Sequence, residues 1–229
     1  MDGVTIDVGE VLLLSLKVAF WSVAASLPPA VAVAWLLARR EFMGKVIVDA
    51  AIHLPLVLPP VVVGFGLLLA MGRNGPVGAL LEPLGITFAF RWTGAALAAA
   101  VMGFPLLVRA IRLSLESTDP RLEAAARTLG AGPWRAFLTV TLPLIVPGIA
   151  TGVLLAFARS LGEFGATITF VSSIPGETQT LPLAIYGALQ VPGGESAALA
   201  LSGVSVVLSL VALAASEWLS RRARGRGAP

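Results

Sequence analysis

The stretch TDPRLEAAARTLGAGPWRAFLTVTLP, from Thr118 to Pro143, is polar, basic and punctuated by Ala and Gly, whereas the segments on both sides are strongly apolar. The 229-residue chain is 57% hydrophobic and only 13% charged, while soluble globular chains carry about 25% charged residues. These values indicate an integral membrane protein. A folded, charged insert between two membrane spans offers a docking surface to a molecule in the aqueous phase.

The residues of this insert predict a compact helix–turn–helix elbow. Asp119 is a good N-cap, Pro120 suits the first helical position, and Gly130 can end the helix in the left-handed conformation. The second helix is expected to begin at Trp134 and to stop before Pro143, because proline removes an intrahelical donor. The first helix should carry an apolar stripe, and the rim should carry arginines that bind acidic groups: Leu122, Ala125 or Ala126 and Leu129 in the stripe, and Arg121, Arg127 and Arg135 at the rim.

A basic loop beside anionic lipid is the simpler explanation of the arginines. It accounts neither for two capped helices nor for the glycine between them, so we favour a docking surface.

Five segments are long and apolar enough to span a membrane, which takes about 20 residues as a helix: Val11–Ala38, Val46–Met71, Trp92–Val108, Pro147–Val171 and Ser196–Trp218. These runs do not alternate, which indicates helices rather than barrel strands. The segment Leu181–Gln190 is apolar but too short to span, and we expect a re-entrant or interfacial helix there. The predicted fold is an all-α polytopic membrane protein, with five transmembrane helices and a short re-entrant helix in a single domain over residues 1–229.

Basic residues predict the orientation, because loops rich in Lys and Arg stay in the cytoplasm. Most Lys and Arg residues follow the first, third and fifth spans: Arg39, Arg40 and Lys45, then Arg109, Arg112, Arg121, Arg127 and Arg135, then Arg221, Arg222, Arg224 and Arg226. We therefore expect the N-terminus outside, and the insert and the C-terminus in the cytoplasm. Trp218 and the arginines after it are expected to anchor the chain at the lipid surface, without a nucleic-acid partner.

The second predicted span reads HLPLVLPPVVVGFG, with Pro55, Pro59 and Pro60 close together. A single proline indicates a packing kink, but three within six residues favour a broken or hinged span, which suits a moving transporter. His53 has apolar neighbours and no evident Asp, Glu or Cys company, so we expect a hydrogen-bonded packing residue. The chain has no Cys, and neither a metal site nor a cofactor is expected.

The order Ala124-Ala125-Ala126, three residues, Gly130, nine residues, Val140-x-Leu142-Pro143 resembles the EAA loop of permease subunits in bacterial ABC importers. In that family the loop holds the coupling helix, which sits in a groove of the cytoplasmic ATPase. The family's Glu position corresponds to Ala124 here, and the Glu stands one residue earlier. The resemblance implies an ATPase-coupling role for Glu123, Ala124, Ala125, Ala126, Arg127, Gly130, Leu142 and Pro143.

Further segments are similar to the molybdate-transporting branch of that family: His53–Pro60, Gly85–Trp92, Phe104–Leu113, Phe157–Thr178 and Val191–Ser196. The resemblance covers nearly the whole chain and implies the type I ABC importer permease fold. It also implies import across the bacterial cytoplasmic (inner) membrane by alternating access. Two copies of the chain would pair, two ABC ATPase subunits would bind beneath them, and a periplasmic molybdate-binding protein would deliver the substrate to the outer loops Ser172–Thr180 and Val191–Ser196.

Arg159 and Glu163 lie four residues apart in the fourth predicted span, hence on one helix face. A central Arg costs about 2.5–3.5 kcal/mol on insertion scales, so such residues face a bundle interior or a water-filled path. Two interpretations stay open: Arg159 meets a passing tetrahedral dianion while Glu163 moderates its charge, or the pair staples helices together. Ser160, Thr167 and Thr169 are candidates to line the same route, although for each alone helix packing is the simpler explanation.

No G-x-x-x-x-G-K-[ST] phosphate loop occurs in the sequence. We therefore expect a non-catalytic subunit that takes its energy from a partner. The alternatives are a permease for another oxyanion, tungstate or sulfate, and an ion-coupled secondary transporter with Arg159 and Glu163 as its coupling site. A membrane scaffold, which would carry no substrate, is a third.

Overall fold

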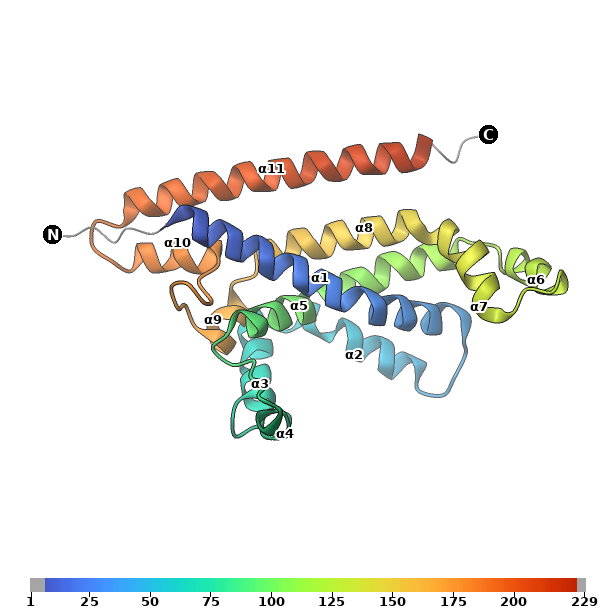
Figure 1. The fold of residues 1–229 in the computed structure, drawn as a ribbon, viewed down its shortest axis with the longest axis horizontal. Coiled ribbons are helices and arrows are strands. Elements are labelled where there is room, and N and C mark those ends of the chain that lie inside the picture. The colour runs from blue at the N-terminus through green and yellow to red at the C-terminus, as the bar shows by residue number, and fades with distance from the viewer. Residues whose placement is uncertain (1–6, 226–229) are drawn as a thin grey trace.

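The computed structural model describes residues 7–225, and within that range it contains helices and no strand. Three long helices pack side by side: α1 (Val8–Arg39), α5 (Trp92–Glu116) and α8 (Leu142–Leu161), with α11 (Glu195–Gly225) lying alongside them (Figure 1). The shorter elements are α2 (Lys45–Val57), α3 (Pro60–Met71), α4 (Gly78–Leu81), η1 (Glu82–Leu84), α6 (Pro120–Thr128), α7 (Pro133–Ala136), η2 (Phe137–Thr141), α9 (Gly165–Val171) and α10 (Leu181–Leu189).

Four helices of the described range are long and apolar enough to cross a membrane, and the bent pair α2 and α3 makes a fifth span if it is counted as one. The two halves of that pair differ in direction by 114°. Neither Pro59 nor Pro60 has a backbone N–H, so the helical hydrogen-bond ladder cannot run through the bend. The break predicted from the prolines is therefore confirmed.

The fourth predicted span, Pro147–Val171, is wrong at its end. The helix α8 stops at Leu161, and a separate helix, α9, begins at Gly165. The buried Glu163 carboxylate accepts a hydrogen bond from the Ala166 N–H at 2.8 Å. This bond satisfies a free N–H in the first turn of α9, and Gly162, Glu163 and Gly165 interrupt the apolar sequence at the break.

The expectation that the second helix of the elbow stops before Pro143 is wrong. Pro133 to Leu161 form one continuous helical stretch of 29 residues, in which the π-helical turn η2 joins α7 to α8. A π-helical turn shifts the hydrogen-bond register by one residue. Pro143 comes two residues after this turn, where the changed register accommodates a residue without an N–H.

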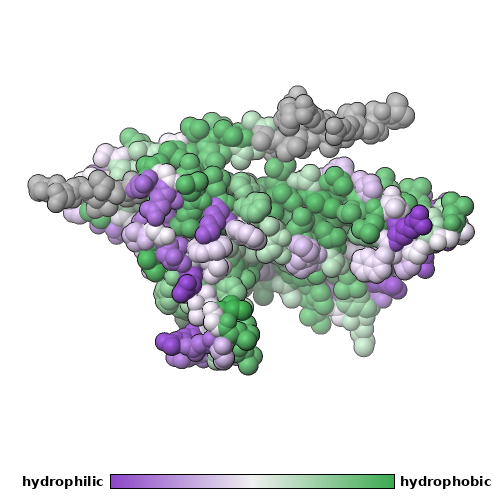
Figure 2. All heavy atoms as spheres, in the orientation of Figure 1, coloured by the Kyte–Doolittle hydropathy of each residue, from purple (hydrophilic) through white to green (hydrophobic). Residues whose placement is uncertain are grey.

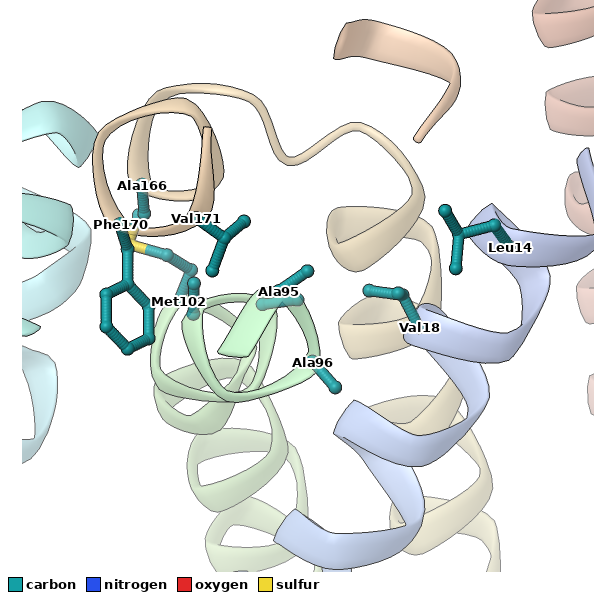
Figure 3. Packing of buried hydrophobic residues seen from close by; sticks show 10 residues of the cluster. Leu14, Val18, Ala95, Ala96, Met102, Ala166, Phe170 and Val171 are labelled. Carbon is teal, nitrogen blue, oxygen red and sulfur yellow. The ribbon is translucent and has the colours of Figure 1, made fainter. Parts of the chain in front are cut away.

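Small side chains let the helices approach closely. Leu14 and Val18 of α1, Ala95 of α5, and Ala166 and Phe170 of α9 belong to one buried cluster (Figure 3). The helix α3 crosses α9 at Gly64, where an added Cβ would overlap the carbonyl oxygen of Ala166. Membrane helices rely on such small-residue contacts, because apolar burial gives little advantage over lipid.

The short segment predicted at Leu181–Gln190 forms α10, nine residues that are too few to span a membrane. It packs against α11 and α1, with Val11, Leu181, Ala184 and Leu201 in one buried cluster. The Leu181 N–H donates to Ser15 Oγ on α1 at 2.8 Å. This contact ties the start of α10 to the long helices.

Hydrophobic residues cover the middle of the molecule, and hydrophilic residues gather toward its two ends and at the tip beyond α3 (Figure 2). The α1–α2 connection, the elbow α6–α7 and the end of α11 all lie at one end (Figure 1). The three basic regions of the orientation prediction are thus together. The side chains of Trp218, Arg221, Arg222 and Arg224, and all of Arg226, fall outside what the structure describes, so the predicted anchor stays a prediction.

Candidate functional site

The first helix of the elbow, α6, begins and ends as its residues predict. The Asp119 carboxylate accepts a hydrogen bond from the Arg121 N–H at 2.9 Å, and Pro120 is the first helical residue. Gly130 has a φ of +91°, in the left-handed region that favours glycine. The turn therefore has a defined geometry, which a docking element requires.

The elbow presents large apolar side chains that are mostly exposed in the described chain. Leu129 is 88% exposed and Trp134 is 78% exposed, and Leu122 is also exposed. Ala124 and Ala125 are exposed between them, with Arg127 beside them. Large apolar side chains grouped at a polar end of the molecule are typical of an interaction surface.

Glu123 ties the two arms of the elbow together. Its Oε2 accepts a hydrogen bond from the hydroxyl of the buried Thr141 in η2 at 2.9 Å. Leu142 and Pro143 follow Thr141 directly and begin α8. A force on α6 can thus pass through Glu123 to the foot of a membrane-spanning helix.

An apolar cavity of about 660 Å³ lies between the elbow and α1. Trp35 and Pro28 of α1 line it from one side, and Trp134, Phe137 and Glu123 from the other. The elbow is therefore not packed tightly onto α1, and its firm attachment runs through η2 into α8.

Arg159 and Glu163 form an ion pair at 2.6 Å, measured from Nη1 to Oε2. The sequence suggested that Arg159 and Glu163 lie on one helix. This is wrong, because Glu163 is buried just beyond the end of α8. Arg159 keeps a partly exposed side chain. The carboxylate is held by both Arg159 and the first turn of α9, which positions the guanidinium firmly.

The three hydroxyl candidates are engaged with protein atoms. Ser160 Oγ lies 2.9 Å from Ser22 Oγ of α1. The Thr167 hydroxyl donates to the carbonyl of Phe164 at 2.8 Å, and the Thr169 hydroxyl donates to that of Gly165 at 2.9 Å. The Thr167 hydroxyl also lies 3.2 Å from the Glu163 carbonyl oxygen. These contacts favour packing roles for all three hydroxyls.

The loop from Ser172 to Thr180 is held by hydrogen bonds, although it is polar and rich in turns. The Ile174 N–H donates to the hydroxyl of the fully buried Thr178 at 2.9 Å. Glu177 Oε1 accepts a hydrogen bond from the Trp92 N–H at 3.3 Å. A loop fixed in this way gives a second molecule a defined surface at the end opposite the elbow.

Sequence reasoning missed a charged cluster between α2 and α5. Arg112 Nη1 lies 3.0 Å from Asp49 Oδ2, and Arg112 Nε lies 2.7 Å from Glu116 Oε1. The expectation that His53 lacks acidic company is wrong, because its Nδ1 lies 3.2 Å from Asp49 Oδ1. The spacing of four residues between Asp49 and His53, and between Arg112 and Glu116, was the available signal.

Comparison with known proteins agrees with this geometry. A family described as "Binding-protein-dependent transport system inner membrane component" matches residues 30–225. The molybdenum transport system permease protein ModB of Escherichia coli (strain K12) is 61% identical over 218 residues, or 95% of each chain. ModB of Haemophilus influenzae is 60% identical over 210 residues, or 91% of this chain and 92% of that protein.

The fold recurs in a crystal structure of a bacterial ABC transporter involved in the import of the acidic polysaccharide alginate. The alignment has a TM-score of 0.73 and 20% identity, and covers 93% of this chain and 78% of that one. Identity this low supports the arrangement of helices alone. With several apolar helices, an elbow at one polar end and this match over most of its length, the chain belongs to the family of binding-protein-dependent transport system inner membrane components.

Proposed function

We propose that the chain is the permease subunit of an ATP-driven importer and moves molybdate across the cytoplasmic membrane by alternating access. The observation that carries this proposal is the capped elbow, whose large apolar side chains are mostly exposed. The similarity over 95% of the chain to a molybdenum transport permease supports the substrate.

The partners follow from this role. Two ABC ATPase subunits would dock on the elbows of two copies of the chain, with Ala124, Ala125, Arg127 and Leu129 at the contact. A periplasmic binding protein would deliver molybdate to the hydrogen-bonded loop Ser172–Thr180 at the opposite end. This arrangement has the N-terminus outside and the elbow in the cytoplasm, as the basic residues predict.

The contacts suggest how the force travels. Closure of the ATPases would pull α6, and the Glu123–Thr141 hydrogen bond would carry the pull to η2. The helical stretch from Pro133 to Leu161 is continuous, so it would act as a lever that reaches Arg159 near its far end. The spans would then tilt and change the side on which the path is open.

Arg159 is the best candidate to meet the oxyanion on this path. Its guanidinium is partly exposed, while Glu163 takes up part of its charge. A path that held its dianion tightly would stop conducting, so a moderated cation suits transit. Ser160, Thr167 and Thr169 would support the geometry of the pair rather than bind the substrate.

The substrate is tested with the complete transporter in vesicles, using labelled molybdate outside and ATP within. We expect ATP-dependent uptake that excess unlabelled molybdate abolishes. Competition by tungstate and sulfate is measured in parallel. Uptake of sulfate at a rate equal to or above that of molybdate would show that the chain serves another oxyanion.

A further inference from the structure

The helix α2 is loosely held compared with the other membrane helices. It has no buried residue and packs chiefly against α5. Gly44, with a φ of +91°, precedes it, and the bend at Leu58 and Pro59 follows it. Glycine and proline at the two ends give α2 hinges about which it can move as a rigid body.

One side-chain ion pair joins α2 to α5 among the residues whose side chains the structure describes, the contact between Asp49 and Arg112 at 3.0 Å. Both side chains are partly exposed. Arg112 also has a second partner on its own helix, Glu116. When the pair separates, Arg112 therefore keeps a carboxylate partner, and the partly exposed Asp49 carboxylate can be solvated, so the penalty for stranding a buried charge is avoided.

The position of Arg112 connects this contact to the elbow. Arg112 and Glu116 lie in the last turns of α5, and three residues, Ser117 to Asp119, separate the end of α5 from α6. A displacement of the elbow therefore reaches the guanidinium over a short length of chain. The same displacement would leave α2 behind, because α2 has no other side-chain ion pair to α5 within the described part.

We propose that the Asp49–Arg112 ion pair is a gating latch. It holds α2 against α5 in the conformation described here and opens when the ATPases pull the elbow, so that α2 swings about the bend at Leu58 and Pro59. This inference rests on the proposed function. It assigns to Asp49 and Arg112 a part in the transport cycle that is separate from both the elbow and the Arg159–Glu163 pair.

The first test is cross-linking, which is clean because the chain has no Cys. The double variant Asp49→Cys/Arg112→Cys is assembled with its ATPase and treated with a short bis-methanethiosulfonate linker. We expect the cross-linking yield to fall several-fold when the ATPase is trapped with ATP and vanadate. An equal yield in the resting and trapped states would overturn the latch, whatever the transport activity of the variant.

The same variant is then tested for uptake in vesicles. Linked protein should import molybdate at less than about a tenth of the unlinked rate, the loss that 1.4 kcal/mol would cause, and reductant should restore it. The single variants, treated alike, should be unaffected by the linker. If the unaltered transporter is active and the linked protein imports molybdate at the unlinked rate, the latch is refuted while the proposed function stands. If the unaltered transporter imports no molybdate, the proposed function fails instead.

A double-mutant cycle separates a latch from two independent structural residues. Asp49→Asn and Arg112→Gln are each expected to lower uptake several-fold. The double variant should lose no more uptake than the single variant with the larger loss. Glu41→Gln is the matched control, since it removes another ion-paired carboxylate that is highly exposed and bonded to Lys45 of α2. Losses that multiply in the double variant, or an equal loss in the control, would contradict the proposal.

Discussion

At the scale of single residues, two glycines at the turn of the elbow differ in backbone conformation but not in the room around them. Gly130 has a φ of +91° and Gly132 a φ of −63°, and an added Cβ would meet no atom within 4 Å at either position. Gly130→Ala should destabilise the folded turn by about 1–2 kcal/mol, because alanine is strained in the left-handed region. Gly132→Ala should leave the stability of the turn almost unchanged.

This difference should appear in ATPase docking. Titration of the purified permease with its ATPase is expected to give weaker binding for Gly130→Ala than for Gly132→Ala. Equal affinities for the two variants would mean that the shape of the turn does not matter for docking.

The Arg159–Glu163 pair permits a second residue-scale prediction. The double variant Arg159→Met/Glu163→Gln removes both charges, and the glutamine oxygen can still accept from the Ala166 N–H, so the protein should stay folded. We expect molybdate uptake to fall at least ~10-fold, since a hydrogen bond to a charged group is worth about 1.5–3 kcal/mol. Normal uptake by a stable double variant would leave the pair only the role of a helix staple.

At the scale of elements, the link between the elbow and α8 can be cut at one hydroxyl. Thr141→Val removes the hydrogen bond to Glu123, whereas Thr139→Val removes one to the carbonyl of Arg135 within its own helix. We expect Thr141→Val to lower the molybdate imported per ATP hydrolysed while ATP hydrolysis continues. The Thr139→Val variant is the control, and the same coupling ratio in both would contradict the lever.

The crossing of α3 and α9 depends on the absence of a side chain at Gly64. Gly64→Ala should destabilise the protein by about 1–3 kcal/mol, because the new methyl group would press against the Ala166 backbone. Gly66→Ala, on the same helix but with no atom within 4 Å of the added Cβ, should be tolerated. Thermal unfolding in detergent measures the difference, and equal midpoints would disprove the close contact.

The sequence predicts elements well where a single residue determines the local backbone conformation. Pro59 and Pro60 marked the bend between α2 and α3, and Asp119, Pro120 and Gly130 marked α6. It failed at two local hydrogen-bonding features. After Leu161 the Glu163 carboxylate accepts from the Ala166 N–H three residues later, and the helix continues through Pro143 behind a π-helical turn.

The candidate site shows the same division. The elbow residues are contiguous in the chain, so a single stretch of sequence revealed them. Asp49 and Arg112 lie 63 positions apart and meet only because α2 packs on α5. Nothing in either segment alone indicates that pairing. The sequence shows only the local spacings of four residues, from Asp49 to His53 and from Arg112 to Glu116.

At the scale of the whole molecule, apolar helices form a middle band, and the elbow stands at one polar end (Figure 2). The sequence contains no phosphate loop. The arrangement suits a subunit that provides the transport path and a docking element, the elbow, while another subunit supplies energy. Its separate parts, the elbow, the lever of α8 and the hinged α2, should therefore change transport together with the state of the ATPase.

The most direct test of this division of labour is labelled molybdate uptake by vesicles that contain the purified permease, with and without its ATPase. We expect uptake only when the ATPase, the binding protein and ATP are all present, and none when a proton or sodium gradient is imposed on the permease alone. Concentrative uptake by the permease alone would contradict the account.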